Sequence, residues 1–401
     1  MSQYCISDHC RWVKGSRGSA IYDLKTGVVH ALNAEETFVI EQLLFVSRIP
    51  DGAEAFVKGL LDKFLLNNHD TPLAEKRIVP SLRYVWLELT VGCNCRCLHC
   101  YGAFGISNQQ NLRTELTTQE WKKIINRIIS LGGREIQLIG GEPLIHPDFC
   151  EILSYAHSVG IQRIDIFTNA TLLTETIADL IAEVKASVRV SIYGCDAATH
   201  DAITRNSGSF SRLDRGLNLL REREIPTTPA VVLMRENQDI LPQIKQYIES
   251  KGLKFQGFDT VRTVTHSTQD SHTVTRREIA RKRIICEQSF KTSPYSFSCS
   301  RQWNNCWFGK FAVTSYGDII PCIFARDLIC GNLRTDSYNI IWEKLLGYWR
   351  ITKDEVSICR ECEFRYSCED CRPLAMGEGT GLYGKYPRCT YVPSDCRWEI
   401  L

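Results

Sequence analysis

From residue 83 to about 264 the apolar positions of the chain switch repeatedly between two spacings. Six short, mostly apolar stretches are predicted strands, at 84–91, 134–139, 161–168, 187–193, 228–234 and 254–261. The segments between them place apolar residues three and four apart, which is the spacing of an amphipathic helix. This alternation of strand and helix predicts a parallel sheet. Six such units predict a partial (β/α)6 barrel of the TIM type, in which the chemistry lies at the carboxyl ends of the strands.

The predicted helices lie at about 121–129, 148–159, 174–184, 209–222 and 240–250. The first is the clearest, because Trp121, Ile124, Ile125, Ile128 and Ile129 share one face of a helix. The residues Thr117 to Glu120 precede it in the order of a capping box. We therefore expect the helix to begin just after Thr117.

Residues 1–75 show a different pattern. Three short strands, Arg11–Val13, Ser19–Asp23 and Val28–Leu32, are separated by turns that contain glycine. Two helices follow, from Asn33 or Ala34 and over Ala53–Leu65; their predicted buried residues are Phe38, Val39, Leu43 and Leu44 in the first and Phe56, Leu60, Leu61 and Leu65 in the second. This order predicts a winged-helix-like domain, for which a purely structural cap is the alternative.

Charge and hydropathy exclude several classes of partner. A net charge of +2 over 401 residues gives no strong attraction to nucleic acid or to a membrane surface. The short basic runs at 276–277 and 281–283 are interpreted as a solvated helical face. No apolar run approaches the roughly 18 residues of a membrane span, and residues 1–15 lack the apolar core of a secretion signal. A cytoplasmic location is expected.

The 19 cysteines are far more than such a chain needs for packing. In a reducing compartment they are better explained as metal ligands than as disulfides. Three of them, Cys93, Cys97 and Cys100, form a C-x3-C-x2-C loop directly after the first predicted barrel strand. Three thiolates can hold three corners of an iron–sulfur cube and leave one iron open to a small molecule. On this loop alone, a zinc knuckle or accidental crowding remains an alternative.

The second strand ends in Gly140-Gly141-Glu142-Pro143. Two glycines allow a backbone to approach a ligand closely, and a carboxylate can accept hydrogen bonds from an ammonium group. The alternative is an ordinary tight turn between a strand and a helix. The turn is stronger evidence for a ligand site because the three-cysteine loop follows the neighbouring first strand.

Together, the cysteine loop and the Gly-Gly-Glu-Pro turn resemble those of the radical S-adenosylmethionine (SAM) superfamily. The resemblance implies that Cys93, Cys97 and Cys100 bind a [4Fe–4S] cluster whose open iron is chelated by SAM. It also implies that Gly140, Gly141 and Glu142 contact SAM. Cys95 matches no ligand position of the family and is expected to be an unligated thiol.

Two later strand ends resemble the family less closely. Thr168-Asn169-Ala170 is similar to its Thr-Asn-Gly, with alanine in place of glycine. The resemblance further implies that Ser191 and Arg205 approach the ribose and carboxylate of SAM, although Tyr193 replaces the usual aspartate and Arg212 competes with Arg205. No catalytic acid or base is assigned.

The remaining clustered cysteines lie between Cys299 and Cys396. Their C-x2-C pairs alone would favour zinc, but their order resembles the SPASM extension of radical SAM enzymes, which carries two auxiliary [4Fe–4S] clusters. The first is then expected on Cys306, Cys322, Cys371 and Cys299, with Cys330 or Cys396 as alternatives to Cys299. The second is expected on Cys359, Cys362, Cys368 and Cys389. Two residues rather than three precede Cys371, which leaves the register of that ligand open.

The expected domains are thus 1–75, the radical SAM barrel at 83–264, a bridging segment at 265–298 and the SPASM domain at 299–401. The N-terminal domain resembles the PqqD-type element that binds the leader of a precursor peptide as an added strand. The resemblance implies a peptide maturase that abstracts hydrogen with a 5′-deoxyadenosyl radical and installs a thioether or carbon–carbon cross-link. It also implies an electron donor such as flavodoxin or ferredoxin.

Two alternatives remain. One is a side-chain oxidase like the sulfatase-maturing enzymes, which carry an acidic residue beside an auxiliary-cluster cysteine where this chain has Ile323 after Cys322. The other is a non-catalytic zinc or electron-transfer protein. The sequence does not identify the modified residue, the bond formed or the oligomeric state.

Overall fold

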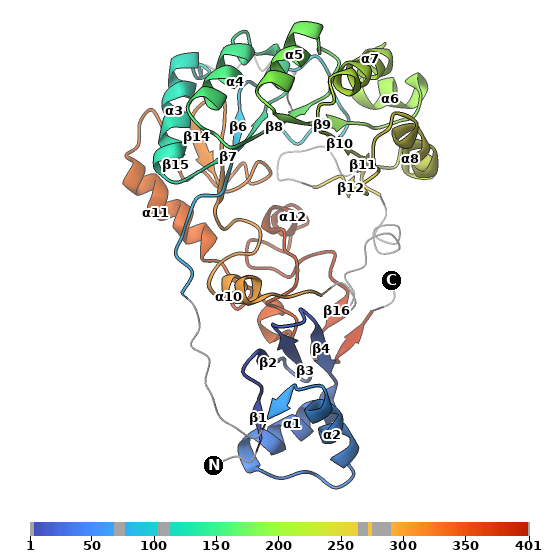
Figure 1. Ribbon diagram of the computed structural model, residues 1–401, viewed down its shortest axis with the longest axis vertical. Coiled ribbons are helices and arrows are strands. Elements are labelled where there is room, and N and C mark those ends of the chain that lie inside the picture. Colours follow the sequence, from blue (N-terminus) through green and yellow to red (C-terminus); the bar gives the residue numbers. More distant parts are fainter. Residues whose placement is uncertain are drawn as a thin grey trace. The chain divides into compact units, whose positions relative to one another are not determined.

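The computed structural model describes residues 4–67, 77–102, 104, 113–263, 272–274 and 290–399 (Figure 1). The chain divides into two compact units. The first combines residues 1–79, 276–308 and 348–401, and the second combines 80–275 and 309–347. The basic runs at 276–277 and 281–283 lie outside the described residues. Within the described ranges, no helix has the length and apolar character needed to cross a bilayer.

The second unit is built on an eight-stranded sheet. Five parallel strands follow the predicted order, namely β6 (Tyr84–Glu88), β7 (Glu135–Ile139), β8 (Arg163–Thr168), β9 (Ser187–Ser191) and β10 (Thr227–Ala230). On the other side of β6, the sheet continues with β13 (Lys310–Val313), which is parallel to β6, and with the antiparallel strands β14 (Asp318–Ile320) and β15 (Gly331–Asn332). The barrel-like order was predicted from the sequence, but this extension was not.

The last predicted strand, and part of the one before it, lie outside this sheet. The stretch at 228–234 divides into β10 and β11 (Val232–Leu233). The strand expected at 254–261 is reduced to β12 (Asp259–Thr260), which pairs in parallel with β11. The barrel is therefore open after β10.

Six helices line the outer side of the sheet (Figure 1). They are α3 (Thr118–Ser130), α4 (Phe149–Ser158), α5 (Glu175–Glu183), α6 (Ala197–Thr204), α7 (Ser209–Glu222) and α8 (Leu241–Ser250). The start of α3 confirms the predicted capping box, because the side chains of Thr117 and Glu120 each accept a hydrogen bond from the other's backbone N–H. A further helix, α11 (Tyr338–Trp349), follows β15.

In the first unit, the N-terminal strands form an antiparallel sheet in the order β2 (Cys10–Lys14), β3 (Ser19–Asp23) and β4 (Val29–Leu32). A short pair, β1 (Cys5–Ile6) and β5 (Leu66–Asn67), lies beside helices α1 (Ala34–Glu41) and α2 (Glu54–Asp62), and a π-helical turn (Gln42–Val46) follows α1.

The predicted buried face of α1 is partly wrong, since Phe38 is 54% exposed while Thr37 and Ile40 are buried. A capping box between Asn33 and Glu36 fixes where the helix begins, and this start turns Thr37 and Ile40 inward.

The N-terminal sheet shares a core with the cysteine-rich C-terminal residues. Tyr22 packs edge-on against Phe297, with ring centroids 5.0 Å apart, and its hydroxyl donates to the carbonyl of Glu363 at 2.7 Å. The same core includes Phe364 and Tyr391. Helices α10 (Pro294–Gln302) and α12 (Arg372–Gly377) and the hairpin of β16 (Tyr391–Val392) and β17 (Arg397–Trp398) complete this unit. Residues 4–67 are therefore packed as part of a larger body.

Candidate functional site

The three-cysteine loop leaves the carboxyl end of β6, as predicted for a barrel active site. Two backbone hydrogen bonds hold it to the end of α6, from the N–H of Arg96 to the carbonyl of Thr204 (2.9 Å) and from Leu98 to Ile203 (3.0 Å). Between these anchors the loop is free of regular structure. The end of α6 thus fixes the backbone that presents Cys97.

The Gly-Gly-Glu turn follows β7 and packs directly on the cysteine loop. The N–H of Gly141 donates to the carbonyl of Thr90, and that of Glu142 donates to the carbonyl of Gly92, both at 2.8 Å. A Cβ atom on Gly141 would lie 2.4 Å from the carbonyl oxygen of Gly92, and one on Gly140 would lie 2.6 Å from that of Thr90. Glycine is therefore required here so that two neighbouring loops can touch.

Glu142 joins the second strand end to the third. Its buried carboxylate accepts hydrogen bonds from the Thr168 hydroxyl (2.6 Å), the Asn169 N–H (2.8 Å) and the Leu144 N–H (3.2 Å). Burial raises the pKa of Glu142 to about 7, although these hydrogen bonds oppose the shift. The predicted residues Glu142, Thr168 and Asn169 thus lie in one hydrogen-bonded group.

Asparagine side chains connect this group to the cysteine loop. The amide of Asn169 donates to the Asn94 side chain at 2.8 Å, and Asn94 donates to the Thr171 hydroxyl at 2.8 Å. Asn206 donates to the backbone carbonyl of Asn94 at 3.0 Å. The amides of Asn169 and Asn206 also lie 3.7 and 3.6 Å from the sulfur of Cys95, which is buried beside Cys93 and Cys97. These amides thus hold the cysteine loop in place through Asn94 and through the unligated Cys95.

The fourth strand end places the ring of Tyr193 beside the cysteine loop. Tyr193 packs against Cys97, and its ring centroid lies 4.5 Å from that of His99. Ser191 is buried at the end of β9, and its assignment to SAM remains a prediction. Arg205, in contrast, is exposed at the left-handed cap of α6, while Arg212 donates to the Asn206 side chain at 2.8 Å. The assignment of Arg205 to SAM remains a prediction.

A second group of cysteines lines a pocket in the first unit. Cys359, Cys362, Cys368 and Cys389 surround it together with residues that include Lys353. Burial raises the pKa of the Cys362, Cys368 and Cys389 thiols, and their mutual repulsion raises it further, to about 12 for Cys368. Four thiols gathered in a buried pocket are stabilised when a metal displaces their protons.

The cysteines expected to hold the first auxiliary cluster lie in both units. Cys299 is buried on α10, the Asn304 side chain accepts the N–H of Cys306, and Cys371 is the N-cap residue of α12. Cys322 is in the second unit and is buried there.

The alternative ligands Cys330 and Cys396 lie beside Lys344 and beside Glu363, respectively. The composition of this ligand set remains a prediction.

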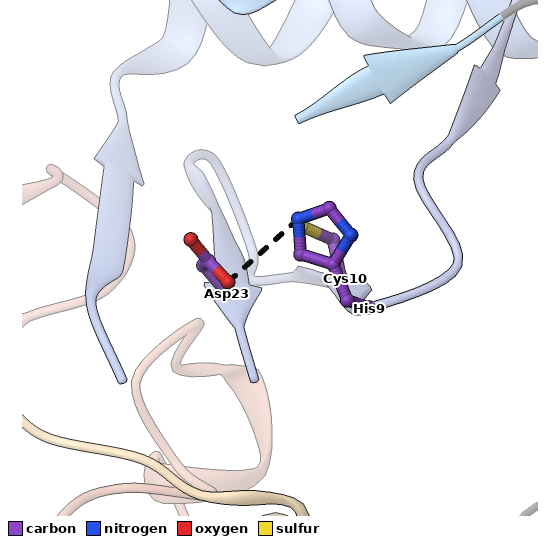
Figure 2. Close-up of side chains that lie close together, drawn as sticks. All are labelled: His9, Cys10 and Asp23. Carbon is purple, nitrogen blue, oxygen red and sulfur yellow. Dashed lines mark ion pairs between the residues drawn. The ribbon is translucent and has the colours of Figure 1, made fainter. Parts of the chain in front are cut away.

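A zinc ion would hold its cysteine ligands in a tight group. Around one tetrahedral zinc ion, with bonds of about 2.3 Å, thiolate sulfurs lie about 3.8 Å apart. Among the described residues, the one group of three or more possible ligand atoms that all lie within 4.8 Å of one another is His9, Cys10 and Asp23 (Figure 2). Among the residues that the structure describes, neither the loop cysteines nor the pocket cysteines form such a group.

The group in Figure 2 has a structural explanation. The Asp23 carboxylate accepts hydrogen bonds from the N–H groups of Lys25 (2.9 Å) and Thr26 (3.1 Å) and thereby shapes the turn between β3 and β4. Cys10 belongs to the hydrophobic core, and burial together with Asp23 raises the pKa of its thiol to about 12.

Two family models match the chain. Residues 87–248 match the radical SAM superfamily, and residues 305–363 match SPASM, described as an iron–sulfur cluster-binding domain. The chain is a radical SAM enzyme with a SPASM domain. The second match includes Cys306, Cys322, Cys359 and Cys362, and it ends before Cys368.

The similar proteins differ in the activities for which they are named. The chain is 28% identical to an AdoMet-dependent heme synthase from Methanosarcina barkeri, over 78% of this chain and 97% of the relative. It is 27% identical to the mycofactocin maturase MftC from Mycobacterium tuberculosis, over 77% of this chain and 83% of the relative. The fold is similar to that of Streptococcus suis SuiB bound to its precursor peptide SuiA, with a TM-score of 0.63, 15% identity and coverage of 97% and 100%.

The radical SAM and SPASM domains imply a [4Fe–4S] cluster that binds SAM and auxiliary iron–sulfur clusters. The residues present suit these groups. Cys93, Cys97 and Cys100 would hold the first cluster beside the Glu142 group, and the pocket cysteines would hold an auxiliary one.

Two asparagines of the site, Asn94 and Asn206, and the buried cation Lys353 of the pocket were not predicted from the sequence. Asn94 and Asn206 lie 112 positions apart, and no periodic pattern marks either of them. Lys353 lies in a turn, where an exposed lysine would be expected from the sequence. The apolar residues Ile351 and Val356, which lie near Lys353 in the sequence, were the one available indication that Lys353 would be buried.

Proposed function

We propose that this enzyme is a peptide maturase, which modifies a ribosomally made precursor peptide. When bound, the open cluster and SAM supply a 5′-deoxyadenosyl radical, which abstracts hydrogen from an unactivated C–H bond. The product we propose is a peptide carrying a thioether or carbon–carbon cross-link. The protein is expected to work in the cytoplasm with a small electron donor such as flavodoxin or ferredoxin.

The N-terminal domain carries this proposal. The likeness to SuiB spans 97% of the chain, so it extends into residues 4–67, and SuiB was solved with a precursor peptide bound. In addition, the relative MftC is a maturase by name. The sheet of this domain has the strand order β2-β3-β4, so that β2 and β4 form its edges. An exposed edge strand can accept a peptide as an added strand.

Two exposed aromatic side chains follow this sheet in the chain, and one of them contacts the edge strand β2. Phe38 lies on α1, directly after β4, and is 54% exposed. Phe45 is 72% exposed, and its ring centroid lies 6.1 Å from that of Trp12 on β2. Aromatic residues at an edge supply the apolar contacts that give an added strand its specificity.

The test starts with short open reading frames beside the gene. A peptide encoded there should bind the enzyme, and incubation with SAM and reductant under anaerobic conditions should change its mass by the loss of hydrogen. Phe38→Glu or Phe45→Glu should weaken peptide binding at least tenfold, while formation of 5′-deoxyadenosine without peptide stays within about twofold. Ile340→Glu, at an exposed position of α11, serves as the matched control.

These point variants are preferable to deletion of residues 1–75, because Tyr22 and Val29 belong to a core shared with the C-terminal residues. Unchanged peptide affinity in both aromatic variants would refute the recognition role.

The heme synthase relative supports a second candidate, a tetrapyrrole substrate. It covers 78% of this chain, whereas the SuiB likeness covers 97%. Conversion of a tetrapyrrole precursor to heme by the reconstituted enzyme, with no change in any peptide, would decide for this candidate. A sulfatase-maturing role is less favoured, because Ile323 follows Cys322 where an acidic residue would be expected.

A further inference from the structure

Lys353 is a buried cation in the wall of the four-cysteine pocket. Its ammonium group donates to the carbonyl of Glu369 at 3.1 Å and lies 3.4 Å from a carboxylate oxygen of Asp370. The side chains of Lys353 and Asp370 are each 3% exposed. Because both groups are removed from water, the charge of Lys353 has a large electrostatic effect on its neighbours.

Asp370 cannot fully neutralise Lys353, because it also forms an ion pair with Arg372. The Arg372 guanidinium is fully buried and donates two hydrogen bonds to the same Asp370 oxygen, the one from Nε at 2.8 Å. Two buried cations thus share one carboxylate, and one positive charge is left over. An uncompensated buried charge costs several kcal/mol. The fold therefore calls for a negative group close by.

The pocket is where that group would lie. Besides Lys353, its wall contains Arg365 and Lys385, and no carboxylate occurs among the described residues that line it. Arg365 is paired outside the pocket with Asp354, at 2.9 Å, whereas Lys385 donates to a backbone carbonyl, that of Tyr391, at 2.8 Å. Such a wall fits an anionic occupant.

A [4Fe–4S] cluster held by four thiolates is an anion, and reduction adds one more negative charge. A fixed cation nearby stabilises the reduced form more than the oxidised form and so raises the reduction potential. We propose that Lys353 is the counter-charge of the second auxiliary cluster, which raises the potential of that cluster. The proposal rests on Cys359, Cys362, Cys368 and Cys389 as its ligands, and it is independent of the peptide substrate.

The test is an EPR-monitored redox titration of the anaerobically reconstituted full chain. It uses a Cys93→Ala, Cys97→Ala, Cys100→Ala background, so that only auxiliary clusters contribute. Lys353→Met keeps the length and apolar stem of the side chain but removes its charge. The midpoint potential of one cluster should become more negative, with unchanged iron and sulfide content. Lys353→Arg should restore the parent value.

The reciprocal variant provides a change of opposite sign. Asp370→Asn removes the negative partner with little change of shape, so the same midpoint potential should become more positive. A purely structural role for the pair would shift the potential in one direction for both variants or would lose iron from both. Asp370→Asn also carries the test if Lys353→Met does not fold.

Lys58→Met, at an exposed position of α2, controls for the loss of a distant positive charge in the same unit and should leave the potentials unchanged. Unchanged potentials in fully loaded Lys353→Met and Asp370→Asn proteins would overturn the proposal. So would an absence of the second auxiliary cluster. Neither result depends on whether a peptide is the substrate, so the proposed function is tested separately.

Discussion

The two cysteine sites of this enzyme contrast in their ligands and in their surroundings. The loop after β6 offers the three ligands Cys93, Cys97 and Cys100, and its neighbours are amides and the Glu142 carboxylate. The pocket in the first unit offers four cysteines, and the charged residues that line it are cations. The first arrangement leaves an iron open for a ligand that carries its own ammonium group. The second closes the coordination and favours acceptance of an electron.

The largest effects are expected when one cysteine ligand is removed from each site, and they should differ between the two sites. Cys97→Ala should abolish the formation of 5′-deoxyadenosine from SAM, because the open cluster is lost. Cys368→Ala should lower the iron content by about one third, from about 12 to about 8 ions per chain, and leave cleavage of SAM within about tenfold of the parent. Iron analysis and chromatography of the nucleoside products measure both.

Cys95→Ala is the matched control for Cys97→Ala, since it removes a neighbouring thiol that matches no ligand position. It should retain the iron and the activity. The contrast between the sites would fail if Cys95→Ala lost the cluster and Cys97→Ala kept it.

The next effect concerns the close packing of the open site. Gly141→Ala would place a Cβ atom 2.4 Å from the carbonyl oxygen of Gly92, so the turn and the cysteine loop must separate. We expect a loss of about 1–3 kcal/mol in the free energy of unfolding, together with weaker SAM binding. Denaturant unfolding and SAM titration check the two consequences.

Gly347→Ala is the control, because an added Cβ meets nothing within 4 Å on the exposed face of α11. This substitution should stabilise the protein by about 0.5–1 kcal/mol. Equal effects of the two substitutions would mean that the glycines of the turn are not packing positions.

A pH-dependent effect tests the support of the cysteine loop. Asp201 is partly buried, which opposes its charge, but hydrogen bonds from the N–H groups of Phe210 and Gly208 and from the Ser209 hydroxyl lower its pKa below the ordinary range. This carboxylate secures the turn between α6 and α7, and the end of α6 anchors the cysteine loop.

Because the folded-state pKa is the lower one, the stabilisation by Asp201 is full above the unfolded pKa of about 3.9 and is lost as the pH falls through the folded value. Asp201→Asn should therefore cost about 1–3 kcal/mol at pH 7. The difference in the free energy of unfolding between this variant and the parent, measured by denaturant unfolding, should disappear in strong acid. A difference that stays constant down to pH 2 would contradict this origin.

The smallest effect concerns Ala170, which stands where the family has glycine and which adopts a left-handed conformation with φ of 58°. Replacement by glycine relieves about 1–2 kcal/mol of strain. Glycine also raises the conformational entropy of the unfolded chain, which costs about 0.5–1 kcal/mol of stability. The loss of a buried methyl group costs about 0.8 kcal/mol more. Ala170→Gly should thus change the stability by less than about 1 kcal/mol in thermal or denaturant unfolding. A loss above about 2 kcal/mol would show that the methyl group is needed for packing.

The parallel strands of the sheet could be predicted because they are buried on both faces, so their apolar runs stand out from the amphipathic helices between them. The extension by β13 was missed, since Lys310–Val313 is short and begins 49 residues beyond the last predicted strand. The buried face of α1 was partly wrong at Phe38, because helix register depends on the cap at Asn33 as well as on apolar spacing.

At the sites, the cysteine spacing and the Gly-Gly-Glu turn could be recognised from the sequence, because each is a short motif whose residue types have few other uses. The amides of Asn94 and Asn206 and the charges of Lys353 and Asp370 could not be read in this way. Their roles depend on contacts between residues far apart in the chain or on burial of a side chain that is usually exposed. Such features become visible only when the fold brings the residues together.

The central claim is that the loop after β6 holds the open cluster and the pocket holds a closed one. The most direct measurement is the EPR spectrum of the reduced enzyme before and after addition of SAM, in the parent, Cys97→Ala and Cys368→Ala proteins. We predict that SAM changes the signal of one cluster in the parent and in Cys368→Ala, and changes nothing in Cys97→Ala. A spectrum that SAM leaves unchanged in the parent, or a response that survives in Cys97→Ala, would contradict the account.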